Sequence, residues 1–314
     1  MSTNSDFQPS AKVITHSITW SPQRSRELIT FSGTFHRYIL SEFNTHRCFS
    51  RNSASSRAIP VSKMLDLAAN ANVYPVEWSQ NMKGMSAEAQ VPDPIKRTSR
   101  VLWDDARNNA IVSARIMSDL EIHKQVTNRL LEPFLPHAVV FTCDYKGLQS
   151  FLALRDSPYA QPEIREFAKA VKNAYNDSAP TKLFPGEVHL PFVDKIYQWE
   201  ELFNLQTITD SSGEYQDDEF MYSPPIYESV ATCARYSYLG HEKDQTPESN
   251  EKLFWSLFQN HHLSPFEHVA VALTPNDTTA KLFRRKILGV AAKPSQNYTG
   301  AFMQLRKVLE KDHK

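Results

Sequence analysis

The chain has 314 residues, of which 41% are hydrophobic and 22% are charged, which is typical of a folded globular protein and excludes a disordered chain. Its 35 lysines and arginines balance 35 aspartates and glutamates. Zero formal net charge disfavours a nucleic-acid-binding protein, because such proteins need a broad basic surface.

The cysteines and the chain's apolar runs limit the compartment. Cys48, Cys143 and Cys233 are odd in number and widely spaced, which disfavours a disulfide framework or a zinc site. The first ten residues are polar, and no run approaches the roughly 20 apolar residues of a membrane span. We therefore expect a cytoplasmic protein with no membrane partner, no nucleic-acid partner and no metal site.

The first half of the chain is predicted to alternate strand and helix after an N-terminal tail. In chain order we expect a flexible tail over residues 1–12, a strand over Leu28–Phe35, a helical turn over Tyr38–Phe43, a helix over Val61–Asn70, a loop over 73–94 and a long helix over Lys96–Leu120. The apolar pattern also permits this helix to continue to Leu131, just before Pro133.

The second half is predicted to contain more helix than strand. In order we expect a strand over Ala138–Cys143, a helix over Leu148–Leu154, an amphipathic helix over Pro162–Tyr175, a proline-rich connection over Pro180–Phe192, an acidic linker over Asp210–Pro225, helices over Tyr227–Tyr238 and Asn250–Gln259, a strand over His268–Leu273 and a helix over Asn297–Lys311.

Residues 45–57 need a chemical explanation, because they carry three arginines, one histidine, one asparagine and four serines with little apolar material. Arginine matches phosphate and carboxylate oxygens with a planar fork of donors, and serine and asparagine add short hydrogen bonds. From composition alone, two interpretations remain open. The segment is either a loop that binds a phosphorylated small molecule or a solvated basic loop.

The spacing His-Arg-x-x-Ser-x-Asn-x-x-Ser-x-Arg, formed by His46, Arg47, Ser50, Asn52, Ser55 and Arg57, resembles the signature of flavin-dependent thymidylate synthases. Four further blocks resemble the same family, namely 128–133, 154–155 with 160–164, 234–238 and 262–268. The resemblance implies an α/β (α+β) fold with long helices and a curved mixed sheet. Taken singly, each of these residues has an ordinary structural explanation.

The order of the blocks is unusual for that family. The blocks at 234–238 and 262–268 follow the arginine–serine motif, whereas ordinary members carry them before it, so the chain resembles circularly permuted, phage-encoded members. Permutation is tolerable when the old termini lie close together at the surface. We expect a nucleotide- and flavin-binding part over 13–209, the acidic linker over 210–225, and a permuted segment over 226–314 that completes the same catalytic domain.

The resemblance also assigns roles to individual residues. Arg155 would be catalytic, because a permanently charged arginine can stabilise negative charge that develops on the pyrimidine. The residues expected to bind the nucleotide are Glu42, Ser55, Ser56, Arg57, Arg129 and Arg155. The residues expected to bind FAD are His46, Arg47, Asn52, Ser150, Ser237, His262, Ser264 and Glu267.

The activity implied is reductive methylation of dUMP to dTMP, with a hydride from reduced FAD and a one-carbon unit from 5,10-methylenetetrahydrofolate. NADPH would reduce the flavin, and the molecule would be a homotetramer. One alternative is an enzyme of the same scaffold that methylates or hydroxymethylates another pyrimidine nucleotide such as dCMP. A second alternative is a non-catalytic nucleotide-binding homologue.

Several positions depart from the family pattern. Thr45 replaces an arginine, Ser53 and Ala54 replace Glu-Gln, and Ala58 replaces a tyrosine. Asp144, Ser150 and Tyr159 stand where two asparagines and a histidine are expected. Glu42 replaces a glutamine near the nucleotide. A carboxylate only accepts hydrogen bonds, so Glu42 would favour a cytosine amino group over a uracil carbonyl.

Overall fold

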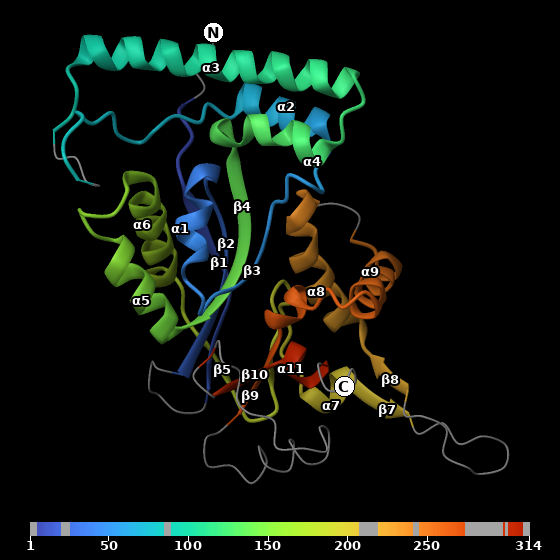
Figure 1. Ribbon diagram of the computed structural model, residues 1–314. Helices are drawn as coiled ribbons and strands as arrows, with labels where there is room; N and C mark the ends of the chain where they lie inside the picture. Colours follow the sequence, from blue (N-terminus) through green and yellow to red (C-terminus); the bar gives the residue numbers. More distant parts are fainter. Residues whose placement is uncertain are drawn as a thin grey trace.

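A five-stranded mixed sheet forms the centre of the computed structural model, which describes residues 5–19, 26–84, 89–206, 219–240, 245–273, 298 and 301–309. Its strand order is β3-β4-β2-β1-β5 (Figure 1). The strands are β1 (Ser10–Thr19), β2 (Glu27–His36), β3 (Ser50–Ser53), β4 (Pro136–Asp144) and β5 (Thr181–Leu183). Neighbouring strands are antiparallel except β1 and β5, and a register shift between Val13 and Thr15 bends β1.

One face of this sheet packs on helices α5 (Tyr145–Arg155) and α6 (Pro162–Asn176), as Figure 1 shows. Alternate residues of β2 and β4 point to this face, which places Phe31 and Phe141 in a core with Phe151 and Phe167. Gly33 allows the close approach of α6, because a Cβ there would lie 2.8 Å from the Phe167 ring.

The opposite face of the sheet carries polar residues and is covered by the later part of the chain. A three-stranded sheet of order β10-β9-β6 forms here from β6 (Val188–His189), β9 (Ala270–Ala272) and β10 (Phe302–Gln304). The helices of this part are α7 (Trp199–Leu202), α8 (Pro224–Arg235), α9 (Pro247–Gln259) and α11 (Leu305–Leu309), with the 3-10 helices η4 (Tyr236–Tyr238) and η5 (Ser264–Glu267). Strands β7 (Phe203–Gln206) and β8 (Glu219–Tyr222) form a separate hairpin ladder.

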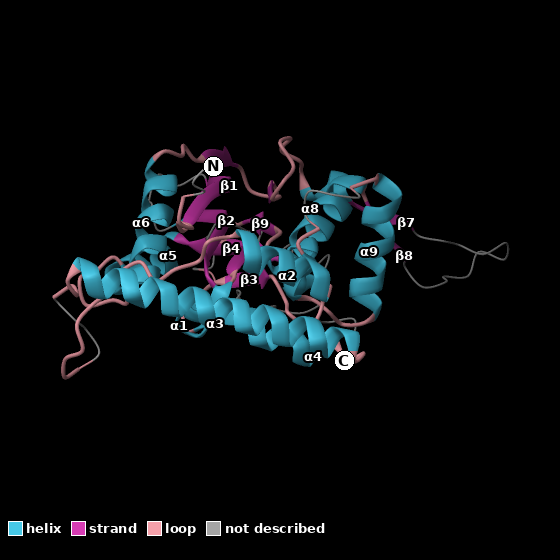
Figure 2. Cartoon of the chain, turned by 90° about the horizontal axis from the view of Figure 1, so that it is seen from above, coloured by secondary structure: helices cyan, strands magenta, loops and turns pink. Residues whose placement is uncertain are grey.

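A helical layer crosses one end of the central sheet (Figures 1 and 2). It contains α2 (Val61–Asn70), α3 (Asp93–Asp119), α4 (Lys124–Thr127) and the 3-10 helix η3 (Asn128–Phe134). One face of α3 packs on α2 and η3 through Ala114 and Trp103. The other face exposes large apolar side chains along the whole helix, namely Ile95, Val101, Leu102, Val112, Ile116 and the following Leu120.

The mixed α/β class, the long helix and the mixed sheet expected from the sequence are confirmed. The segment before the motif forms β2, the 3-10 helix η2 (Arg37–Ile39) and α1 (Leu40–Asn44), as predicted for 28–43. The helix predicted over Val61–Asn70 has those bounds. None of the described helices is both long and apolar enough to cross a lipid bilayer.

Some predicted boundaries were wrong. The long helix does not continue to Leu131, because Glu121 adopts a left-handed conformation (φ 59°) and His123 then caps the short helix α4. Strand β1 begins at Ser10, inside the segment expected to be a flexible tail. The connection predicted over 180–192 contains β5 and β6, whose backbones pair with β1 and β9.

Two predictions at the later boundaries also differ from the structure. In the segment expected to be the linker 210–225, residues 219–222 form β8 and Pro224 begins α8, where proline is tolerated in the first turn. Residues 210–218 lie outside the described residues. Within the helix predicted over 297–311, residues 302–304 form β10 by pairing with β9, and only 305–309 are helical. Residues 297, 299–300 and 310–311 lie outside the described residues.

Candidate functional site

The motif begins beside the end of helix α5, where His46 contacts Arg155. The Nε of Arg155 donates to His46 Nε2 at 3.0 Å. The Nη2 of Arg155 donates to the backbone oxygen of Glu42 at 3.3 Å and to Thr45 Oγ1 at 3.1 Å. Among the described residues, Nη1 of Arg155 has no hydrogen-bond partner. The guanidinium is therefore held on one edge and offers two N–H donors on the other.

The imidazole of His46 is buried against aromatic rings of the core. It stacks on Phe49 with centroids 5.7 Å apart and meets the Phe151 ring edge-on at 4.9 Å. Burial, followed by the nearby charges of Arg155 and Arg51, lowers the pKa of His46 to about 4. His46 is thus neutral at physiological pH, and its Nε2 serves as the acceptor that Arg155 needs.

Further along the motif, strand β3 brings Asn52 to the later part of the chain. The Nδ2 of Asn52 donates to Ser264 Oγ at 3.0 Å, and Asn52 Oδ1 lies 3.0 Å from His268 Nε2. Ser264 begins η5 and His268 follows it, so a contact across more than 200 residues joins the motif to the block 262–268.

Glu267 lies next to this contact and is fixed by the end of the described chain. Arg306 forms an ion pair with the Glu267 carboxylate, and Tyr298 donates to the Glu267 backbone oxygen at 2.8 Å. The side chain of Gln304 donates to Ser50 Oγ at 2.9 Å. Burial raises the pKa of Tyr298 far above its ordinary value, so its hydroxyl remains a donor.

The end of the motif forms a third group of contacts around Glu132 of η3. Its Oε1 accepts from Ser56 Oγ at 2.7 Å, from Arg129 Nη1 at 2.8 Å and from Arg37 Nη2 at 3.0 Å. Arg37 is buried and also donates to the Ala54 backbone oxygen at 2.8 Å. One carboxylate therefore orients a serine hydroxyl and two arginines.

The structure brings together some of the predicted site residues. His46, Glu42 and Arg155 share one group of contacts, Asn52 and Ser264 a second, and Ser56 and Arg129 a third. Ser55 joins through its backbone, whose N–H donates to the Ser237 carbonyl oxygen at 2.8 Å. Each of the three groups includes a residue of the segment 45–57, namely His46, Asn52 or Ser56. The roles assigned to these residues stay predictions.

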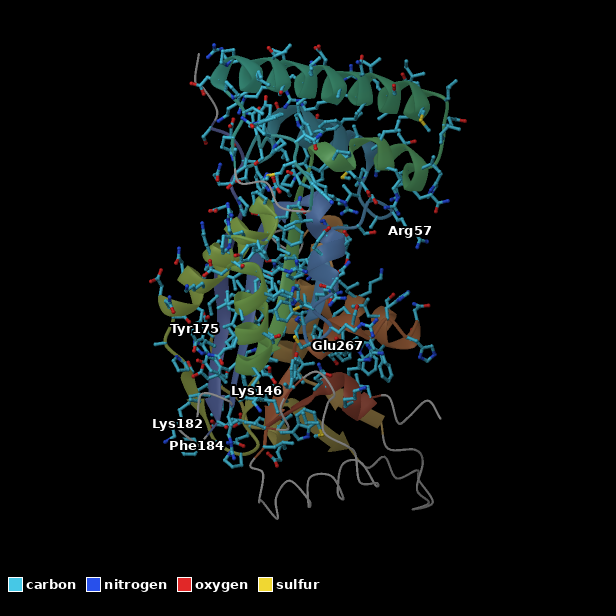
Figure 3. All side chains as sticks on the ribbon, turned by 60° about the vertical axis from the view of Figure 1, so that its left-hand side comes forward. Arg57, Lys146, Tyr175, Lys182, Phe184 and Glu267 are labelled. Atoms are coloured by element: carbon cyan, nitrogen blue, oxygen red, sulfur yellow. The ribbon has the colours of Figure 1, made fainter. Side chains whose placement is uncertain are left out.

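Other predicted residues are exposed. The side chains of Arg47 and Arg57 are exposed and have no ion-pair partner among the described residues. Ser150 on α5 and His262 before η5 are also exposed. In Figure 3, Arg57 and Glu267 both lie toward the right-hand side of the view, whereas Tyr175 lies on the left.

The departures from the family pattern have structural explanations at two positions. Asp144 caps α5, since its Oδ1 accepts from the Gly147 N–H at 2.7 Å, and a carboxylate near a helix N-terminus is stabilising. Thr45 accepts from Arg155, and its own hydroxyl donates to the Glu42 backbone oxygen at 2.7 Å. Tyr159 is 82% exposed, and we find no structural reason for its presence.

Sequence reasoning missed four residues that organise the site, namely His268, Glu132, Arg37 and His137. Two of them were in the recognised blocks, since His268 ends the block 262–268 and Glu132 lies in 128–133. Arg37 carried no signal, because its partners Ala54, Ser56 and Glu132 are adjacent to it only in the folded chain. His137 is fully buried and accepts from Arg37 Nη1 at 2.7 Å.

Comparison with known proteins identifies the family. A family model described as thymidylate synthase complementing protein matches residues 11–181, which is more than half of the chain. Two solved structures of a UMP/dUMP methylase from Streptomyces cacaoi, bound with 5-Br UMP and 5-Br dUMP, are 14% and 16% identical. They have TM-scores of 0.45 and 0.44, cover 54% of this chain, and are themselves covered to 89% and 90%.

No curated protein sequence matches the chain. The family match covers the motif 46–57 and the blocks at 128–133 and 154–164, whereas 234–238 and 262–268 lie beyond it. The match over residues 11–181 confirms the resemblance seen in the sequence: the chain belongs to the thymidylate synthase complementing protein family, that of the flavin-dependent thymidylate synthases.

Proposed function

We propose that this protein is a flavin-dependent thymidylate synthase that methylates dUMP to dTMP, using 5,10-methylenetetrahydrofolate and NADPH. Beside family membership, one observation carries the proposal. Arg155 is held by three hydrogen bonds on one edge and offers Nη1 on the other, and it contacts the motif segment 45–57, which also exposes Arg47. A preorganised donor of this kind stabilises negative charge as it develops on a reacting ring.

The donor set fits an anionic flavin nucleotide. His46, Arg47, Asn52, Ser150, Ser237, His262, Ser264 and Glu267 would hold FAD, as the family pattern implies. Two features of this chain support the fit. Arg47 is an exposed cation without an ion-pair partner among the described residues, and Asn52, further along the motif, pairs with Ser264 of η5, which is also exposed. When bound and reduced, FAD would supply the hydride for the methylation.

The contacts around Glu132 support a nucleotide phosphate site. Arg37 and Arg129 both pair with Glu132, and Lys124 donates to the Ala58 backbone oxygen, next in the chain to Arg57, at 2.8 Å. Glu132 carries one negative charge against the two of Arg37 and Arg129, so an excess of positive charge remains. Ser55, Ser56, Arg57 and Arg129 would bind the phosphate and ribose of the substrate, and Arg155 would contact the base.

Glu42 favours a second candidate substrate, dCMP. Its Oε2 accepts from Ser41 Oγ at 2.7 Å, and among the described residues its Oε1 has no donor. Arg155 donates to the backbone oxygen of Glu42, and a carboxylate on the same residue would attract the amino group of cytosine and repel the carbonyl of uracil. The Glu42→Gln variant separates these readings, because an amide suits uracil and would shift the preference toward dUMP.

We also propose that the protein is a homotetramer and that it is located in the cytoplasm. The exposed apolar stripe of α3, from Ile95 to Leu120, supports an interface between copies, since large apolar patches on a surface mark contact sites. The three cysteines are free thiols, as expected in a reducing compartment.

The test is a direct product assay. The purified protein is incubated with NADPH, methylenetetrahydrofolate and either dUMP or dCMP, and the products are weighed by mass spectrometry. Formation of dTMP from dUMP supports the main proposal, whereas methylation or hydroxymethylation of dCMP alone would replace it with the second candidate. A protein that binds dUMP, lacks a flavin absorbance band and yields no product would be a non-catalytic homologue.

A further inference from the structure

A continuous chain of hydrogen bonds runs from the motif through the central sheet to the second sheet. It contains, in order, Ser264, Asn52, His268, Thr142, Thr30, His189 and Ser17. The six donor–acceptor distances are 3.0, 3.0, 2.8, 2.6, 2.8 and 2.8 Å. These residues come from five strands, β3, β4, β2, β6 and β1, and from the segment of η5, yet their side chains meet on one face of the sheet.

The middle of this series of hydrogen-bonded side chains is buried away from water. His268, Thr142, Thr30 and His189 each have 0% exposure, and Ser17 has 2%. Asn52 is 8% exposed, and Ser264 is exposed. The series of hydrogen bonds therefore reaches the surface at Asn52 and Ser264, which are the two members assigned to the proposed flavin site.

The bonds can all be satisfied only if they point the same way. Burial lowers the pKa values of His189 and His268 to about 3, so each imidazole is neutral and carries one N–H. Because the Oδ1 of Asn52 can only accept from His268, Ser17 must donate to His189 Nδ1, and His189 Nε2 must donate to Thr30. Each hydroxyl also has one hydrogen, so the direction fixed at one link fixes the next.

The same direction continues toward the surface. Thr30 donates to Thr142 Oγ1, and Thr142 donates to His268 Nδ1. His268 Nε2 donates to Asn52 Oδ1, which leaves the Asn52 amide nitrogen to donate to Ser264. If the direction were reversed, the amide of Asn52 would turn over and offer its oxygen instead.

We propose that His268 is a positioning residue of the flavin site, and that with Thr142 behind it His268 fixes the orientation of the Asn52 amide presented to the cofactor. This inference rests on the proposed function, since it takes Asn52 and Ser264 to contact FAD. His268 acts through Asn52 and does not itself touch the cofactor. The direction of the bond that His268 makes is coupled, one link at a time, to the hydrogen bonds from Thr142 to Ser17.

If Thr142 had only a packing role, its substitutions would rank in a different order. If Thr142 only filled space, valine would replace it well, because valine has nearly the same shape, and serine would be worse, because it lacks the buried methyl group. If its hydroxyl sets the tautomer of His268, the order is reversed. Thr142→Val and Thr142→Ser are therefore a matched pair of variants, and Thr142 is not among the residues proposed to contact the flavin.

The experiment measures FAD binding to apoprotein by quenching of flavin fluorescence, together with urea unfolding of each variant. We expect Thr142→Val to bind FAD about tenfold more weakly, as when a buried hydrogen-bonding group loses its partner, and Thr142→Ser to bind as wild type does. His268→Leu should lose at least as much affinity as Thr142→Val. His268→Gln should recover most of it, because a glutamine amide can accept from Thr142 and donate to Asn52.

Thr19→Val is the control, since Thr19 is a buried threonine of β1 whose hydroxyl has no partner among the described residues. It should leave FAD affinity unchanged. Unchanged affinity in Thr142→Val, or a greater loss in Thr142→Ser, would overturn the inference while leaving the proposed function intact. If the wild-type protein bound no FAD, both the proposed function and this inference would be wrong.

Discussion

Replacing Arg155 tests the central chemical claim. Arg155→Ala removes the guanidinium that offers Nη1 toward the proposed substrate and also removes the three bonds that hold it to His46, Glu42 and Thr45. Arg155→Lys keeps the positive charge but cannot reproduce the fork of donors. Comparison of the two variants separates the effect of charge from the effect of orientation.

The expected magnitudes follow from these contacts. Loss of one preorganised donor to a developing negative charge lowers kcat by about 10²–10³, which we expect for Arg155→Ala. For Arg155→Lys, the charge is kept but is no longer held in place by the three bonds, and we expect a loss of about 5–30-fold in kcat, or roughly 1–2 kcal/mol of transition-state stabilisation. Folding stability should fall by no more than roughly 1–2 kcal/mol in either variant, because the three lost bonds lie at the half-exposed end of α5.

The assay is a single-turnover measurement under anaerobic conditions, in which protein carrying reduced flavin is mixed with dUMP and methylenetetrahydrofolate and dTMP is quantified after rapid quenching. This separates the chemical step from substrate binding. Arg115→Ala, an exposed arginine on α3, is the matched control and should be unaffected. If Arg155→Ala kept kcat within about threefold of wild type, the catalytic assignment would be refuted.

Three further outcomes are expected. His137, His189 and His268 are fully buried, and burial lowers their pKa values from 6.5 to about 3. Below pH 6.5 these histidines take up protons only in the unfolded chain, so the free energy of unfolding should fall as the pH drops, by about 4 kcal/mol at pH 5.5. Equal midpoints in urea titrations at pH 8 and pH 5.5 would contradict this. Arg129→Ala should raise KM for dUMP about tenfold but not KM for deoxyuridine, which lacks the phosphate, and an equal change for both would exclude phosphate binding. Ile116→Glu, on the exposed face of α3, should lower the mass measured by light scattering during gel filtration, and an unchanged mass would exclude that face as an interface.

Local patterns predicted most of the helices and central strands. Val61–Asn70 was readable because Pro60 precedes an amphipathic run, and α6 because Pro162 opens one. The end of α3 could not be predicted, since nothing in the sequence around Glu121 indicates that this residue adopts a left-handed conformation. Strand β10 was not predicted, because its three residues form a strand only by pairing with β9.

The site was predictable only as far as recognised blocks reach. The motif 46–57 and Arg155 were identified from spacing, and the structure brings His46 and Arg155 into contact. The partners that orient them are set by tertiary packing. His268 meets Asn52 from 216 positions away, and Arg37 meets Glu132 from 95 positions away. No periodicity or composition encodes such pairs.

The bond between Gln304 and Ser50 has a consequence for how the protein is made. Ser50 leaves the ribosome 254 residues before its partner, which at ordinary translation rates is a delay on the order of 10–50 s. Until then β3 lacks Gln304, and Glu267 lacks the cation of Arg306. The polar face of the nascent N-terminal sheet is therefore completed only after residue 304 has emerged, which places the closing of this face among the late steps of folding.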